Sequence, residues 1–276
     1  MDKVSIIIPC YNSGKVLDRA VSSVQNQTWK NCEVIIVNDG SNDKVTLNLL
    51  SKMKGVKVLN QSNQGLSSAR NKGIKNATGN FVLFLDSDDY VRFDAVEIMI
   101  NKVKNFEFSY AFCDIQLRGK KTGNRIKYYN FFEQLFINHI PYFILIKKDI
   151  IKQIGAYDTN MKYGYEDWEL NIRLAKNGFF PIRVEETLFF YNVSSNGMLN
   201  SVSKTKHMQI LNYIKKKHQD IYNFKKIMLI YLKWRKEKMN YNIIIYVIIW
   251  ILSSVLPSEI YNKIYNSAYK FKQKLF

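Results

Sequence analysis

The sequence predicts an α/β fold in which a mostly parallel central sheet is flanked by helices and followed by a C-terminal helical extension. Between Lys3 and Asp86, short β-branched runs alternate with polar segments of helical spacing, which is typical of parallel strands joined by covering helices. Beyond residue 203 the composition changes to long helices that are rich in Lys and Tyr and poor in Gly and Pro. We therefore expect two parts, residues 1–203 and residues 204–276.

Four apolar runs mark the strands of the first part: VSIII, EVIIV, VKVL and FVLFL. Polar or glycine-containing turns follow three of them, with the sequences PCYNSG, NDGSND and DSDDY. In open α/β sheets, ligands bind at the carboxyl ends of the strands. We therefore expect these three turns to converge on one crevice.

Helical segments connect and follow these strands. The stretch GLSSARNKGI predicts a helix over about residues 66–77 that presents Arg70 near its first turns. Residues 94–104 predict another helix, and YAFCDIQ predicts a further strand. The segment YGYEDWELNIRLAKNGF predicts a helix that opens on Glu166 and Asp167, where carboxylates often serve only as caps.

Length, cysteine content and the N-terminus narrow the class of protein. The 276 residues suffice for one large or two smaller domains with a sizeable core. Three scattered cysteines without CxxC spacing argue against a disulfide framework or a zinc site. The N-terminal apolar run of five residues before Pro9 is too short for a secretory signal. We therefore expect a cytoplasmic protein.

Three carboxylates, Asp86, Asp88 and Asp89, follow the apolar run FVLFL directly. They would repel one another unless a cation or hydrogen-bond donors compensate, so the cluster favours a hard divalent metal with oxygen ligands. Magnesium and manganese take one or two protein carboxylates and complete their shell with water and phosphate oxygens. The alternative is a turn whose aspartates cap a helix that starts near Phe93, which is the commoner role of an isolated DxD.

The motifs do not stand alone. Their order, IIIPCYNSG, VIIVNDGSND, GLSSARNKGI, FVLFLDSDD and GYEDWELNIRL, resembles the family-2 inverting glycosyltransferases. The resemblance spans roughly residues 3–200 and implies a Rossmann-like catalytic domain of the GT-A fold, that of the nucleotide-diphospho-sugar transferases. It also implies a hexosyltransferase that acts in bacterial surface-glycan synthesis.

The resemblance assigns nucleotide-binding roles to the turns. Tyr11 matches the aromatic residue that lies against the base, and Asp39 matches the carboxylate that accepts from the base's imide N–H. Because a carboxylate only accepts, this pairing favours uracil or thymine over a purine. Arg70 is placed to contact the nucleotide, or it forms a salt bridge to Asp39 or Asp86. The expected nucleotide-sugar site comprises Pro9, Tyr11, Asp39, Arg70, Asp86 and Ser87.

The resemblance also implies the metal and catalytic residues. The first aspartate of the family's DxD contacts ribose and the last binds the metal, which assigns ribose to Asp86 and Mn²⁺ or Mg²⁺ to Asp88. Asp167 matches the general base that takes the proton from the acceptor hydroxyl, and Glu166 matches a carboxylate that hydrogen-bonds acceptor or donor sugar. This division is chemically reasonable, because attack opposite the leaving diphosphate needs a base on one side and charge neutralisation on the other.

Nearby residues have less specific roles. Asp89 is expected to support the metal ligand or to cap a helix. Trp168 can form a sugar-stacking wall, but a tryptophan on the apolar face of a helix is more often a core residue, and we expect the core. Many relatives place a metal-binding histidine and a basic residue in a late loop. In the corresponding stretch here, LFFYNVSSNGMLNSVSKTKH, the first histidine is His207 and the first basic residue is Lys204. Either these late residues fold back over the diphosphate or the metal is held more weakly and by more water.

The C-terminal part is basic and contains a strongly apolar block. Residues 204–276 carry 15 Lys or Arg against 3 Asp or Glu. The apolar core of residues 242–257 is about 10–14 residues long, short of the roughly 17–25 of a membrane span, which favours an interfacial or re-entrant segment. A buried helix at a homodimer interface is the alternative. Residues 258–276 form a basic amphipathic pattern with aromatic edges, which favours an anionic lipid surface.

These observations predict a metal-dependent transferase with a UDP-sugar donor and a glycan or lipid-linked glycan acceptor, as in capsule or lipopolysaccharide assembly. We expect it to lie peripherally on the inner face of the cell membrane. Nucleic acid is not an expected partner, because it does not explain the isoleucine block. The alternatives are a catalytically silent scaffold subunit of a membrane glycan-assembly complex and a sugar nucleotidyltransferase, for whose glycine-rich loop PCYNSGK is a poor match.

Overall fold

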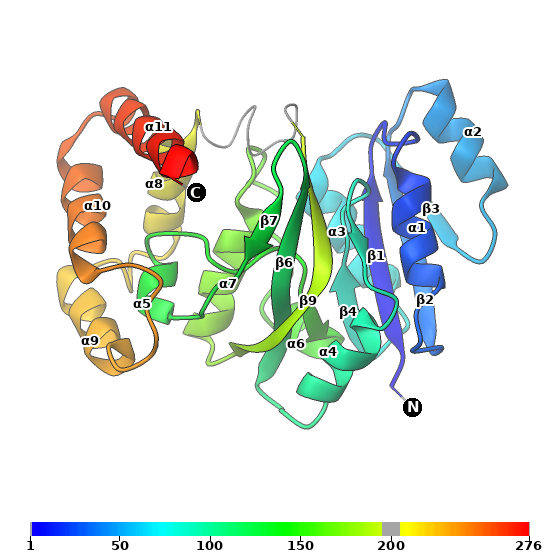
Figure 1. Ribbon diagram of the computed structural model, residues 1–276, viewed down its shortest axis with the longest axis horizontal. Coiled ribbons are helices and arrows are strands. Elements are labelled where there is room, and N and C mark those ends of the chain that lie inside the picture. The colour runs from blue at the N-terminus through cyan, green and yellow to red at the C-terminus, as the bar shows by residue number, and fades with distance from the viewer. Residues whose placement is uncertain (1, 195–204, 276) are drawn as a thin grey trace.

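The computed structural model describes residues 2–194 and 205–275 and contains a mixed sheet followed by helices (Figure 1). The strands are β1 (Val4–Cys10), β2 (Cys32–Asp39), β3 (Lys57–Gln61), β4 (Phe81–Phe84), β5 (Tyr90–Val91), β6 (Ser109–Gly119), β7 (Gly123–Arg125), β8 (Leu145–Lys147) and β9 (Phe180–Val193). The helices are α1 (Leu17–Gln25), α2 (Lys44–Lys52), α3 (Leu66–Asn76), α4 (Ala95–Val103), α5 (Phe131–Gln134), α6 (Lys148–Gln153), α7 (Glu166–Lys176), α8 (His207–Lys217), α9 (Phe224–Trp234), α10 (Ile243–Val255) and α11 (Ser258–Leu275).

The sheet has the strand order β3-β2-β1-β4-β8-β6-β9-β5, and β7 pairs with β6. The four N-terminal strands of this order, β1 to β4, are parallel, as the alternation of strand and helix in the sequence predicts. Beyond β4 the pairing becomes mixed, because β8 runs antiparallel to both β4 and β6, while β6 and β9 are parallel. The expected mostly parallel mixed sheet is therefore present.

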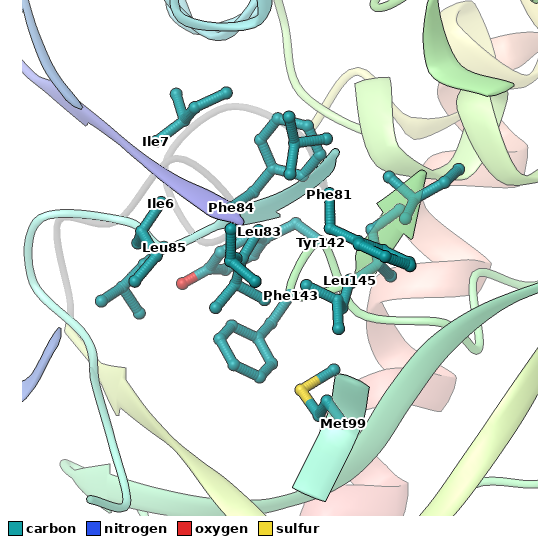
Figure 2. Close-up of a cluster of buried hydrophobic side chains, with 14 of the residues drawn as sticks. Ile6, Ile7, Phe81, Leu83, Phe84, Leu85, Met99, Tyr142, Phe143 and Leu145 are labelled. Carbon is teal, nitrogen blue, oxygen red and sulfur yellow. The ribbon is translucent and has the colours of Figure 1, made fainter. Parts of the chain in front are cut away.

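The centre of the sheet is buried on both sides because β1 and β4 consist almost entirely of apolar residues. Each residue of β1 and of β4 is buried. Figure 2 shows the cluster around β4, in which Phe84 lies with residues of β1, such as Ile7, and with Phe143 from the segment before β8. Met99 of α4 closes the cluster from a helix. This apolar packing fixes the end of β4, from which the acidic turn projects.

The predicted helices are found close to their expected bounds. The helix expected over residues 66–77 is α3, and its residues Ala69, Gly73 and Ile74 are buried against the sheet. The helix expected over residues 94–104 is α4. α7 starts at Glu166, directly after Tyr165 in the left-handed conformation with φ 60°, so the chain turns sharply into its first carboxylates.

The C-terminal helices pack on the first part of the chain. Figure 1 shows α8 to α11 gathered at one end of the molecule beside α5 and α7, with α1 and α2 at the other end. One apolar cluster joins Trp168 and Ile172 of α7 to Leu211 and Ile214 of α8. Another joins α5 to α9 and α10, where Tyr246 is fully buried. The helical extension thus shares its core with the elements that carry Glu166 and Asp167.

Among the described residues, no helix combines the length and the apolar character that crossing a membrane requires. α10 is 13 residues long and is strongly apolar, and only Tyr246 and Ser253 of it are buried. Its remaining apolar residues are partly or largely exposed.

The contact between α3 and β1 predicts the effect of Gly73→Ala. A Cβ atom at Gly73 would overlap the side chain of Ile7, so the substitution should destabilise the fold by about 1–3 kcal/mol even though alanine favours helices. Urea unfolding followed by circular dichroism measures this, with Lys75→Ala on the exposed face of the same helix as the control. A variant as stable as the parent would show that α3 and β1 are not in close contact.

Candidate functional site

The turns after β1, β2 and β4 converge, as the sequence predicts. The side chain of Asn12 accepts a hydrogen bond from the amide of Asn42 at 2.9 Å, and the amide of Asn12 donates to Ser41 Oγ at 3.0 Å. Ser87 Oγ donates to Ser13 Oγ at 2.9 Å, which joins the turn after β4 to the turn after β1. Three segments that are distant in the sequence therefore lie together at the carboxyl ends of the strands, where the sequence predicts the crevice.

A buried arginine joins this crevice to α7. Arg70 is fully buried, and its guanidinium donates to Asp86 Oδ1 at 2.7 Å and to Glu166 Oε1 at 2.5 Å. It lies between two aromatic rings, 5.0 Å from the centroid of Tyr142 and 5.1 Å from that of Tyr157. The sequence predicted a salt bridge to Asp39 or Asp86, and Asp86 is the partner in the structure. Glu166 is a second partner that was not predicted.

The charges around Arg70 offset the cost of its burial. Burial by itself would lower the pKa of Arg70, but the charges of Asp86 and Glu166 more than compensate and raise it, so the guanidinium stays protonated. A buried charge is tolerated only when it is paired and hydrogen-bonded in this way. The Arg70 side chain is fully buried, and its guanidinium contacts Asp86, Glu166 and the rings of Tyr142 and Tyr157.

The three aspartates after β4 have different environments. Asp89 is fully buried and accepts from the amide of Asn192 at 2.6 Å and from the hydroxyl of Tyr142. Asp86 is bound by Arg70. Asp88 is half-buried, and Arg19 Nη2 donates to its backbone oxygen at 2.8 Å. Asp89 therefore supports the turn, and it does not cap α4, which begins after Asp94.

Asp88 is the carboxylate of this turn that fits a divalent cation. Burial and then the charge of Asp86 raise the pKa of Asp88 to about 6, which is the signature of negative charge without sufficient compensation. Within the described residues, no group of three or more His, Cys, Asp or Glu side chains forms a closed metal site. A single available carboxylate suits Mg²⁺ or Mn²⁺ completed by water and phosphate oxygens, but not a structural metal cage.

Asp39 lies at the end of β2 and is already bound by a neighbouring loop. Its Oδ1 accepts from the amide of Gln64 at 2.8 Å and from Gln61 Nε2 at 2.7 Å, and its Oδ2 accepts from the amide of Gly65 at 2.8 Å. A carboxylate offers about four acceptor positions, so roughly one is left for a base. These donors also orient the carboxylate rigidly.

The two other residues expected near the base occupy very different positions. Pro9 is buried within β1 opposite Val37 of β2 and shapes the strand end. Tyr11 follows in the turn and is 48% exposed, so its ring has an open face on which a base can stack.

The first turn of α7 places two carboxylates in different roles. Glu166 is buried and bound to Arg70, whereas Asp167 is half-buried and accepts from the amide of Trp168 at 2.8 Å. Burial and then the charge of Glu166 raise the pKa of Asp167 to about 7, a value suited to a general base near neutral pH.

The sequence matches a family model over residues 5–166, and that model is described as Glycosyl transferase family 2. The chain belongs to glycosyl transferase family 2. The matched region contains the turns after β1, β2 and β4 and ends at Glu166, one residue before Asp167. The expected family is confirmed.

Relatives of the family-2 chain have the same character. The chain is 35% identical over 144 residues to glycosyltransferase GlyA of Streptococcus pneumoniae. The aligned region covers 50% of this chain and 19% of GlyA. The chain is 28% identical over 227 residues to the uncharacterized glycosyltransferase YwdF of Bacillus subtilis, covering 78% of this chain and 84% of YwdF. The chain thus spans about a fifth of the length of one relative and most of another.

Solved structures support the GT-A fold. The structure of Staphylococcus aureus TarS 1–349 in complex with UDP-GlcNAc superposes on this protein with a TM-score of 0.66 at 19% identity. The superposition covers 78% of this protein and 66% of the TarS chain. At this identity the likeness concerns the fold. The expected α/β fold with a mostly parallel mixed sheet is confirmed.

Sequence reasoning missed several residues of the site. Tyr142 and Tyr157 enclose Arg70 from loops that carry no recognisable motif, and Arg19 reaches the acidic turn from α1. No local pattern marks these residues, because each acts through a tertiary contact.

The structure describes two of the three remaining residues from the sequence analysis, Trp168 and His207. Trp168 is fully buried and donates from its indole to the oxygen of Gln134 at 2.6 Å, so it is a core residue as expected. His207 is also buried, with its ring 3.8 Å from that of Tyr265, and burial lowers its pKa to about 3. It packs among aromatic side chains. Lys204 lies outside the described residues.

The buried position of Arg70 predicts a large effect of Arg70→Met on stability. The substitution leaves Asp86 and Glu166 without their shared partner, so unfolding should become easier by about 3–5 kcal/mol. The matched control is Arg92→Met, since Arg92 also bridges two carboxylates but at the surface, where a loss of about 0–1 kcal/mol is expected. Equal destabilisation of the two variants in urea would contradict the central role of Arg70.

Proposed function

We propose that the chain is a metal-dependent inverting glycosyltransferase that moves a sugar from a UDP-sugar to a hydroxyl of a glycan or lipid-linked glycan. The observation that carries this proposal is the ion bridge of Arg70, which holds Asp86 of the acidic turn beside Glu166 of α7. One buried cation thereby brings the expected donor side of the crevice next to the expected acceptor side. Membership of family 2 supports transfer from a nucleotide sugar.

On the donor side, Tyr11 stacks on the base and Asp39 accepts from its imide N–H. The exposed ring of Tyr11 and the fixed orientation of Asp39 support these roles. A pyrimidine with an imide donor is favoured, because the carboxylate has no proton to give to a purine acceptor. The complex of TarS with UDP-GlcNAc, in a similar fold, supports UDP as the carrier. Asp86 and Ser87 then lie toward the ribose and Asp88 toward the diphosphate.

A divalent cation, Mn²⁺ or Mg²⁺, would be held by Asp88 together with the diphosphate. When bound, it neutralises the charge that develops on the leaving diphosphate. Asp88 supplies the protein ligand, and the neighbouring Asp86 and Asp89 are engaged by Arg70 and by Tyr142 with Asn192. Arg19, which contacts the backbone of Asp88, keeps the turn in place.

On the acceptor side, Asp167 is the proposed general base. It removes the proton of the acceptor hydroxyl as that oxygen attacks the anomeric carbon, while the bond to the diphosphate breaks on the opposite face. Glu166 is bound to Arg70 and hydrogen-bonds a sugar with its remaining acceptor capacity. Attack from the face opposite the leaving group inverts the configuration at the anomeric carbon.

The helical extension supports a role at an anionic membrane surface in surface-glycan assembly. Its exposed apolar side chains lie on α9, α10 and α11: Met228, Leu229, Leu232, Ile244, Ile245, Val247, Ile248, Ile251, Val255, Ile260 and Ile264. The same part of the chain carries a large excess of Lys and Arg. Apolar side chains among cations match the interface of a bilayer that contains anionic lipids, where a lipid-linked acceptor resides.

The proposed activity predicts the behaviour of Asp167→Asn. The variant should release UDP from a UDP-sugar in the presence of acceptor at least about a hundredfold more slowly than the parent, since the general base is lost, while its affinity for UDP is unchanged. Incubation with a panel of UDP-, GDP- and dTDP-sugars and Mn²⁺, with nucleotide release as the readout, tests this. Asp18→Asn, at an exposed position on α1, is the control. Full turnover by Asp167→Asn would remove Asp167 as the base, and a parent inert on every donor would favour a silent scaffold.

The raised pKa of Asp167 predicts the pH dependence. A base works when deprotonated, so kcat/KM should rise as the pH increases through about 7 and fall about tenfold per unit below it. The profile is measured with the cognate donor between pH 5 and 9. A rate that stays constant down to pH 5 would contradict the assignment.

The membrane proposal predicts the effect of a triple substitution, Ile244→Ser, Ile248→Ser and Ile251→Ser, on one exposed side of α10. Co-sedimentation with vesicles that contain phosphatidylglycerol should be lost, whereas Val45→Ser with Leu47→Ser on exposed α2 should have no effect. Neutral vesicles should bind the parent more weakly. Undiminished vesicle binding by the triple variant would overturn the proposal. It would also be overturned if the parent forms a dimer through these isoleucines and does not bind vesicles.

A further inference from the structure

The phenol of Tyr142 contacts the acidic turn, Asp86 to Asp89, from a separate part of the chain. Tyr142 is a buried residue of the segment that leads into β8. The backbone amide of Asp86 donates to its hydroxyl oxygen at 3.1 Å. The same hydroxyl donates to Oδ2 of Asp89. One side chain therefore binds the first and the last aspartate of the turn.

The two hydrogen bonds determine where the proton of the phenol lies. A backbone amide only donates, so the oxygen of Tyr142 accepts from Asp86, and its single proton is left for Asp89. Asp89 is fully buried, and a buried carboxylate is tolerated only when donors replace the lost water. Its other oxygen, Oδ1, accepts from the amide of Asn192 near the end of β9 at 2.6 Å. The two oxygens of Asp89 thus attach the turn to two different elements.

The ring of Tyr142 contributes a third contact. Its centroid lies 5.0 Å from the guanidinium carbon of Arg70, and Arg70 donates to Asp86 Oδ1 at 2.7 Å. A cation held over an aromatic face is attracted to it, most strongly where water is excluded. Tyr142 therefore acts on the backbone of Asp86 directly and on its carboxylate through Arg70.

Packing on β9 fixes the place of the hydroxyl. The ring of Tyr142 meets the ring of Phe189 edge-on, with centroids 5.5 Å apart, and Phe143 stacks on Phe189 at 4.6 Å. Tyr142 and Phe143 belong to the buried cluster of Figure 2. Side chains in such a close-packed core occupy one rotamer, so the hydroxyl is presented to the turn in a constant position.

Asp88 lies between the two aspartates that Tyr142 binds. The turn is closed by the amide of Asp89, which donates to the backbone oxygen of Asp86 at 3.2 Å. The backbone oxygen of Asp88 accepts from Arg19 Nη2 at 2.8 Å. The position of the Asp88 carboxylate consequently depends on how its neighbours are held.

We propose that Tyr142 is a positioning residue for Asp88, the carboxylate that is the proposed ligand of the divalent cation. This inference rests on the proposed function. It adds that a tyrosine more than fifty residues beyond the acidic turn determines the metal affinity of that turn. Removal of the groups that orient a metal ligand lowers metal affinity about 10–100-fold, so the effect is measurable.

The test is Tyr142→Phe, which keeps the ring over Arg70 and removes the hydroxyl. Binding of Mn²⁺ to the whole chain is followed by electron paramagnetic resonance at saturating UDP and without sugar, so that turnover does not enter. The dissociation constant of Mn²⁺ should rise at least about tenfold. Equal Mn²⁺ affinity in the parent and in Tyr142→Phe would overturn the proposal.

The matched control is Tyr110→Phe. The hydroxyl of Tyr110 on β6 donates to Asn171 Oδ1 at 2.8 Å, and both residues are buried. This variant therefore also loses a buried hydrogen bond, but one that does not reach the acidic turn. Its Mn²⁺ affinity should equal that of the parent. If Tyr110→Phe weakened Mn²⁺ binding as much as Tyr142→Phe, the effect would be one of general stability and the proposal would be wrong.

Hydrogen exchange of the metal-free protein gives a second readout. The amide of Asp86 should exchange slowly in the parent and at least about tenfold faster in Tyr142→Phe, because its acceptor is gone, with no change in Tyr110→Phe. Fast exchange of this amide in the parent would contradict the inference without any variant. Parental Mn²⁺ binding that survives faster exchange in Tyr142→Phe would overturn the inference alone. A parent that binds neither UDP nor Mn²⁺ would contradict the proposed function and the inference together.

Discussion

The buried guanidinium of Arg70 is the interaction on which the crevice depends. It joins α3, the turn after β4 and the first turn of α7, which are far apart in the sequence. A charge in this position must be paired, and its two partners are as dependent on it as it is on them. The rings of Tyr142 and Tyr157 exclude water from it and strengthen the attraction. One ion network thus holds the turn after β4 beside the first turn of α7.

The helical extension is part of the same architecture. The expected boundary near residue 203 separates two compositions, but the apolar clusters cross it, and Glu133 is satisfied by donors from residues beyond it. The sides of α10 differ in burial. Tyr246 enters the core and binds Glu133, while isoleucines on its other sides remain exposed. One side of α10 therefore contacts α5, and the other sides present an apolar surface.

The sequence predicted those features that depend on local pattern. β-branched runs predicted β1 to β4, and glycine and polar residues predicted the turns, so these elements lie close to their expected bounds. It could not predict the partners of Arg70 in full, because Glu166 lies 96 residues away and is selected by packing. Nor could it show that Asp39 is bound by Gln64 and Gly65. The contacts of Tyr142 with Arg70 and Asp89 arise only when loops meet, and no periodicity encodes that meeting.

The proposed function requires that the crevice binds a uridine nucleotide and a divalent cation. Calorimetric titration of the whole chain with UDP, GDP and dTDP, each with and without Mn²⁺, tests this most directly. We expect that UDP binds, that GDP does not, and that Mn²⁺ strengthens the binding of UDP through Asp88. Absence of binding by all three nucleotides, or equal binding of UDP and GDP without any effect of Mn²⁺, would contradict it.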